Sequence, residues 1–233
     1  MGGKVGLKGT DGQEIVKKAM ELGAAPISPG RAIQALERVA RIKDDVELMT
    51  YPFEMGEDEA RNCGLNPIVI GSIMRGKTTA KDTINAAREM LKLKLDLILF
   101  AGGDGTAKDI YEAIGRKVPV LGIPAGIKIH SGVFAINPKK AGELAVKFLE
   151  KDALLCEAEV MDIDEEAYRK GRVSARLYGY LRVPYERSLV QPVKSGSLTI
   201  LDEKKSQEIV ADYVVEKMDD NYYYILSPGT TVR

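Results

Sequence analysis

An unbroken apolar run ends in a glycine-rich turn near the middle of the chain. Residues 97–101 (Leu-Ile-Leu-Phe-Ala) have the pattern of a strand buried on both faces, as in a parallel sheet. The turn Gly102-Gly103-Asp104-Gly105-Thr106 follows directly, and then comes a helical pattern that Gly115 ends. A strand, a glycine turn and a helix in this order predict an anion site, because glycines allow close backbone approach and the first helical amides are free.

Asp104 gives this turn a more specific meaning. A carboxylate repels phosphate, so it fits a role in handling a proton or a metal beside phosphates rather than in cradling them. A kinase needs such a group to orient the acceptor hydroxyl during phosphoryl transfer. The alternative is that Asp104 only caps the following helix. Its place among Gly102, Gly103 and Gly105 favours the functional interpretation.

A second glycine loop follows the next apolar run, at residues 122–135 (Gly-Ile-Pro-Ala-Gly-Ile-Lys-Ile-His-Ser-Gly-Val-Phe-Ala). Lys128 could neutralise phosphate charge, and His130 could donate to a ligand or titrate near neutral pH. A structural role for this lone histidine is equally open. Ser131 either contributes to the site or caps a helix that begins at Gly132.

The two glycine loops carry a family resemblance. The pentapeptide 102–106 resembles the GGDGT signature shared by NAD kinases and by diacylglycerol and sphingosine lipid kinases, and phosphofructokinases have a similar turn. The second loop resembles that of the ATP-NAD kinase-like family, AcoX-like proteins included. Residues 1–11 and 226–231 also resemble that branch. The pentapeptide is specific for the superfamily but not for the acceptor substrate.

The resemblance implies a kinase that uses ATP or polyphosphate with Mg²⁺, and with NAD as acceptor it would phosphorylate the adenosine ribose 2′-hydroxyl to give NADP. Asp104 would be the catalytic residue that orients or deprotonates this hydroxyl. The predicted nucleotide- and phosphate-binding residues are Gly102, Gly103, Gly105, Thr106, Gly126, Lys128, His130 and Ser131. Two alternatives stay open: a kinase of a lipid or another small metabolite, and a non-catalytic nucleotide-binding or regulatory protein.

Alternating strand and helix patterns predict an α/β fold with a three-layer, mostly parallel sheet. Strands are expected at residues 46–50, 67–71, 97–101 and 118–123, and helices at about 12–22, 28–41, 54–63, 79–93, 107–114 and 137–151. Ligands of such sheets bind beyond the carboxyl ends of the strands. We therefore expect the two glycine loops to line one crevice.

The pattern changes near residue 156. Residues 157–163, 173–183 and 197–201 have strand patterns without long helices between them, and a helix at 207–218 and a strand at 222–226 close the chain. We therefore expect a nucleotide-binding α/β domain at residues 1–155 and a β-rich second domain at 156–233. The resemblance implies a strand and an Asn-Pro phosphate loop at the start that this chain does not show, and further residues at the end. Either the start is cut or the chain has lost a sheet strand, so the fold is expected to be incomplete.

Composition excludes several other classes. Lys plus Arg and Asp plus Glu both number 34, so there is no overall field to attract nucleic acid or an anionic membrane. We find no secretory leader and no apolar run of transmembrane length. Two cysteines without metal-type spacing and a single histidine predict no resident metal and a reducing, cytoplasmic compartment. Abundant Lys and Glu hint at a thermophilic source, and the resemblance implies a homo-oligomer, a dimer or tetramer.

Overall fold

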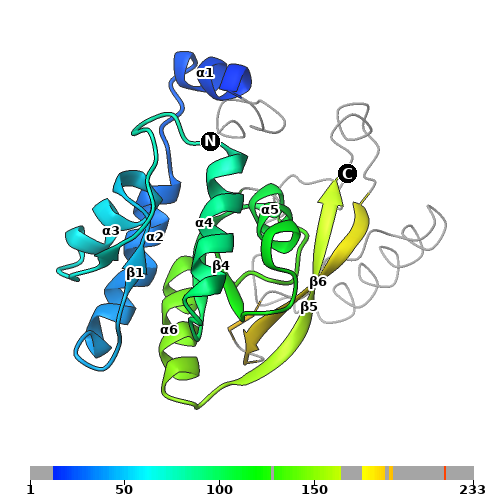
Figure 1. The fold of residues 1–233 in the computed structure, drawn as a ribbon. Coiled ribbons are helices and arrows are strands. Elements are labelled where there is room, and N and C mark those ends of the chain that lie inside the picture. Colours follow the sequence, from blue (N-terminus) through cyan, green and yellow to red (C-terminus); the bar gives the residue numbers. More distant parts are fainter. Residues whose placement is uncertain (1–12, 127–128, 164–174, 187–188, 191–217, 219–233) are drawn as a thin grey trace. The chain divides into compact units, whose positions relative to one another are not determined.

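A computed structural model describes residues 13–126, 129–163, 175–186, 189–190 and 218 of the chain. The chain divides into two compact units, Met1–Lys194 and Ser195–Arg233. All the helices and strands described below belong to the first unit, which Figure 1 shows as a coloured ribbon. The two strands and the helix predicted between residues 197 and 226 lie outside the described residues, apart from residue 218.

Helices and strands alternate along the first unit. The α-helices are α1 (Gln13–Glu21), α2 (Ser28–Val39), α3 (Glu57–Asn62), α4 (Ala80–Lys92), α5 (Asp104–Ile114) and α6 (Pro138–Leu149). The strands are β1 (Met49–Thr50), β2 (Ile68–Val69), β3 (Ile98–Gly102), β4 (Val120–Pro124), β5 (Leu154–Ile163) and β6 (Ala175–Tyr185), and two short 3₁₀ turns lie at Ala40–Ile42 and Phe53–Met55.

The strand, turn and helix predicted around Asp104 are confirmed. β3 pairs in parallel with β4, with Ile98 opposite Val120, and α5 begins two residues after β3 ends. Gly115 ends α5 with φ +56°, a left-handed backbone that favours glycine. The parallel pairing places the carboxyl ends of β3 and β4, and hence both glycine loops, at one edge of the sheet.

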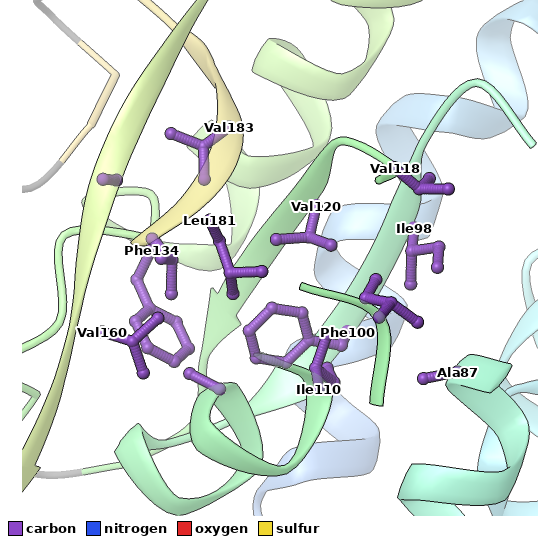
Figure 2. Packing of buried hydrophobic residues seen from close by; sticks show 14 of the residues in the cluster. Ala87, Ile98, Phe100, Ile110, Val118, Val120, Phe134, Val160, Leu181 and Val183 are labelled. Carbon is purple, nitrogen blue, oxygen red and sulfur yellow. The ribbon is translucent and has the colours of Figure 1, made fainter. Parts of the chain in front are cut away.

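The main hydrophobic core lies between this sheet and the β5–β6 hairpin. Figure 2 shows Phe100 of β3 and Phe134 of the second loop inside this core, and their rings meet edge to face with centroids 5.4 Å apart. Val160 and Leu181 of the hairpin are fully buried in the same cluster. The β5–β6 pair itself is antiparallel and confirms the strand predicted at 157–163 and, from Ala175 on, the strand predicted at 173–183, whose first two residues lie outside the described ones. The domain boundary near residue 155 stays a prediction.

The expected continuous sheet is wrong for the described residues. β1 pairs in parallel with β2, and β3 pairs in parallel with β4, but no ladder joins β1 to β3 in this part of the chain. Both β1 and β2 are two residues long, shorter than residues 46–50 and 67–71 suggested. The structure therefore contains small parallel sheets, because apolar composition sets where a strand can form but not which edges pair.

Several helix ends follow local signals in the sequence. Thr79 and Asp82 form a reciprocal capping box at the start of α4, and the Asn137 side chain accepts from Lys140 N at the start of α6. Met20 of α1 is 48% exposed. None of the helices in the described part of the chain is long and apolar enough to span a bilayer.

Candidate functional site

The two glycine loops touch each other. Ala125 N donates to Gly102 O at 2.9 Å. A Cβ atom built on Gly126 would lie only 3.6 Å from the Cα atom of Gly103, and one on Gly102 would lie 2.4 Å from Thr106 Oγ1. Glycine at position 102 thus leaves room for the Thr106 side chain, and residues of both loops line one cleft, as expected.

Asp104 joins the two loops through its carboxylate. Its Oδ2 accepts from the backbone N–H of His130 and its Oδ1 accepts from the backbone N–H of Ser131, both at 2.9 Å. The side chain is only 10% exposed. Gly103, not Asp104, occupies the N-cap position of α5, and no side chain caps that helix. The interpretation of Asp104 as a simple helix cap is therefore wrong.

The start of α5 provides free amide donors beside this carboxylate. The first helical hydrogen bond runs from Ala107 N to Gly103 O. The amides of Asp104, Gly105 and Thr106 consequently have no acceptor within the helix. Together with the positive end of the helix dipole, such amides favour an anion. The site thus combines an anion-binding backbone with a fixed carboxylate.

His130 lies against Asp104. Its ring Nδ1 is 3.5 Å from Asp104 Oδ2, and the imidazole is 14% exposed. Nδ1 is enclosed by protein and has no hydrogen-bond partner among the described residues. His130 and Asp104 both line the adjacent cleft. The structure therefore brings together two of the predicted site residues that are 26 positions apart in the sequence.

Ser131 has a buried contact of its own. Its Oγ accepts from Met161 N at 2.9 Å, and the residue is 2% exposed. The neighbouring Gly132 N donates to Glu159 O at 2.8 Å, so β5 holds the second loop in place. No helix begins at Gly132, because residues 132–135 form a turn and a bridge beside β4. Lys128 lies outside the described residues, and its role stays a prediction.

A cleft of about 2870 Å³ extends from the glycine loops between β1 and β3. Gly102–Thr106, Gly126 and His130 line it near the loops, and residues of α2 and α4 line it farther away. Typical ligand pockets have volumes of about 300–1,000 Å³. The cleft is therefore larger than one nucleotide requires.

Tyr51 lines the same cleft and was not among the residues selected from the sequence. Its hydroxyl donates to Glu89 Oε2 at 2.6 Å, which ties the end of β1 to α4. Burial, together with this carboxylate, raises the pKa of Tyr51 far above its usual range. Tyr51 therefore stays protonated and does not serve as a base. No local sequence pattern signals this contact, because the partners are 38 residues apart.

The loop between β2 and α4 has the letters of a second phosphate motif, Gly-x-x-x-x-Gly-Lys-Thr at residues 71–78. Its geometry does not match that role. Gly76 N already donates to Glu54 Oε1. Thr79 N and the Thr79 hydroxyl both donate to Asp82 Oδ2 at 2.8 Å. A carboxylate thus already accepts from the Gly76 amide of this motif, and α4 begins only at Ala80, two residues after the motif ends.

A resident metal does not fit the described side chains. Within the described ranges, no group of three or more His, Cys, Asp or Glu side chains is placed to hold a metal ion. Mg²⁺ in nucleotide sites is commonly held by substrate phosphates and water with only one or two carboxylates.

The fold and the site define a class: an α/β domain whose glycine loops offer backbone amides to an anion beside an enclosed carboxylate, as phosphotransferases require. The family model described as the ATP-NAD kinase N-terminal domain matches residues 21–153, more than half of the chain. The chain therefore belongs to this family and is a kinase of the NAD-kinase type. No curated protein and no solved structure matches it.

Proposed function

We propose that the protein transfers a phosphoryl group from ATP to the adenosine ribose 2′-hydroxyl of NAD, giving NADP. The observation that carries this proposal is the Asp104 carboxylate, fixed by two amides at the point where the glycine loops meet. The family supports the reaction type. The alternative donor is polyphosphate, which would use the same anion-binding backbone.

In the proposed site, the backbone of Gly102, Gly103, Gly105 and Thr106 shapes the phosphate pocket and supplies free amides. Gly126 of the second loop lies beside Gly103. Asp104 orients the acceptor hydroxyl, since each carboxylate oxygen has a lone pair beyond the one that its amide uses. Mg²⁺ bound to the nucleotide would neutralise phosphate charge during transfer. His130 and Ser131 belong to the same loop. In this proposal Ser131 acts indirectly, because its contacts with Asp104 and Met161 hold the loop in position.

Two unpaired thiols, Cys63 and Cys156, support a reducing, cytoplasmic compartment as part of the same proposal. Burial is the main factor that raises the pKa of each thiol. Neither cysteine is therefore a ready nucleophile at neutral pH.

A screen of acceptors tests the proposed function. The purified protein is incubated with γ-labelled ATP and Mg²⁺ together with NAD, a sphingoid lipid, a diacylglycerol or a sugar phosphate. Label transferred to NAD supports the proposal, and label transferred to a lipid or sugar instead identifies another acceptor. Nucleotide binding without transfer to any acceptor would indicate a regulatory protein and would contradict the proposed reaction.

A further inference from the structure

The pair formed by His130 and Asp104 has the geometry of a carboxylate that orients an imidazole. Asp104 Oδ2 lies 3.5 Å from His130 Nδ1, and both side chains are at least 86% enclosed. The two backbone hydrogen bonds of Asp104 fix the carboxylate, and one of them comes from His130 itself. A small rotation of the ring would convert this separation into a hydrogen bond, as catalytic contacts often tighten only with substrate bound.

The enclosed position of His130 Nδ1 beside Asp104 determines which ring nitrogen carries the proton in the neutral imidazole. An unprotonated Nδ1 would direct its lone pair at the Asp104 carboxylate, and the two would repel each other. A protonated Nδ1 could instead donate its N–H to that carboxylate after a small rotation of the ring. Nδ1 has no other partner among the described residues. The arrangement therefore favours the Nδ1–H tautomer, which leaves the lone pair on Nε2.

We propose that His130 Nε2 is the proton acceptor for the substrate hydroxyl and that Asp104 orients and stabilises the imidazolium. This inference rests on the proposed kinase function and deepens it by dividing the work between two residues. The hydroxyl oxygen forms a bond to the γ-phosphorus of a nucleoside triphosphate, while the bond from that phosphorus to the β–γ bridging oxygen breaks. The bond's electron pair stays on the departing diphosphate, and the hydroxyl proton moves to Nε2.

The Asp104 carboxylate can orient both the His130 imidazole and the acceptor hydroxyl. Asp104 and His130 line the cleft at the loops, where an acceptor hydroxyl has to meet the phosphate. A carboxylate that fixes the tautomer and supports the charged imidazole is the arrangement known from acid–base dyads on unrelated folds. A phosphate-binding histidine would behave differently, because its loss would weaken nucleotide affinity rather than the chemical step.

The tautomer can be measured without any substrate. His130 is the single histidine of the chain, so ¹⁵N-histidine labelling gives one imidazole spin system. We expect the ¹⁵N shifts of the neutral ring to show Nδ1–H and an unprotonated Nε2. In Asp104→Asn the share of Nδ1–H should fall, whereas Asp152→Asn, the same change at an exposed carboxylate after α6, should leave it unaltered. A neutral wild-type ring protonated at Nε2 would overturn the assignment.

Kinetic measurements provide a second test of the proton-acceptor role of His130. His130→Asn keeps an amide donor near the Nδ1 position but removes the base, so turnover should fall about 10²-fold or more with the nucleotide Kd unchanged. Turnover near the wild-type value, or a change in Kd alone, would refute the proton-acceptor role. If no acceptor in the screen is phosphorylated, the proposed function fails. The tautomer measurement would then still decide, on its own, whether Asp104 orients His130.

Discussion

The Asp104 carboxylate has a structural role in this protein as well as the proposed chemical one. Its position at the start of α5 places a negative charge near the positive end of the helix dipole. Its two oxygens also hold the backbone of His130 and Ser131. A carboxylate held by donors on two sides keeps a fixed orientation, which is what a group that positions a substrate hydroxyl requires. The same residue therefore supports the loop and the proposed chemistry.

Glu59 provides a test at the same scale that does not depend on activity. It is 6% exposed, and its Oε2 lacks a partner among the described residues. Burial is the main factor that raises its pKa, and hydrogen bonds from the backbone of Gly56 and Glu59 oppose this only in part. The folded protein therefore binds the proton more tightly than the unfolded chain does.

Stability contributed by Glu59 is consequently present at low pH and is lost as pH rises through the folded-state pKa. Glu59→Gln removes the buried charge, so we expect its thermal midpoint to exceed the wild-type midpoint by a few degrees near about pH 8. The difference should vanish near about pH 4. The measurement is calorimetry at both pH values, with the exposed Glu37→Gln as a control. An equal shift at both values would contradict the assigned cause.

Individual elements were predictable where the signal is local. The run before Gly102 and the stop at Gly115 fixed β3 and α5, and Asn137 with Pro138 fixed the start of α6. Pairing of β1 was not predictable, because two backbone hydrogen bonds to β2 depend on distant chain segments. The hydrogen bonds from the backbone of residues 130 and 131 to the Asp104 carboxylate were not predictable for the same reason. Composition and spacing indicate which residues belong to a site but not which donors they meet.

The crossing of α2 and α6 gives a prediction at this scale. Gly142 of α6 lies against α2, and a Cβ atom there would stand 2.2 Å from Ala35 O, a backbone atom. We expect Gly142→Ala to destabilise the protein by about 1–3 kcal/mol, the usual cost of overpacking. Gly30→Ala is the matched control, since nothing lies within 4 Å of its Cβ position in α2.

The control should stabilise the protein by about 0.5–1 kcal/mol, because alanine loses less entropy than glycine in a helix. Thermal midpoints of the two variants should therefore move in opposite directions, by about 2–4 °C per kcal/mol. Equal shifts in the same direction would mean that α2 and α6 do not pack as described.

At the scale of the molecule, the cleft provides the space for substrates and the family indicates the type of reaction. A space of about 2870 Å³ reaches from the glycine loops to Tyr51, and within the first unit it is bordered by helices and by the edges of two small sheets. The family domain ends at residue 153, while the main core continues into the β5–β6 hairpin. The hairpin therefore stabilises the loop that carries His130, through Met161 and Glu159.

The resemblance to NAD kinases also leads us to propose a homo-oligomer, a dimer or a tetramer. Light scattering coupled to size exclusion at micromolar concentration should give a mass of two or four chains of 25.5 kDa. A mass of one chain across a tenfold dilution series would contradict the proposal.

The most direct test of the account compares the initial rate of NADP formation from NAD and Mg-ATP in the wild type and in Asp104→Asn. Asn offers one acceptor oxygen in place of two, so we expect a stability loss of about 1–3 kcal/mol, and both proteins are assayed well below their midpoints. The wild type should form NADP, and the variant should do so about 10²-fold or more slowly with nucleotide affinity retained. Equal rates in the two proteins would contradict the role of Asp104.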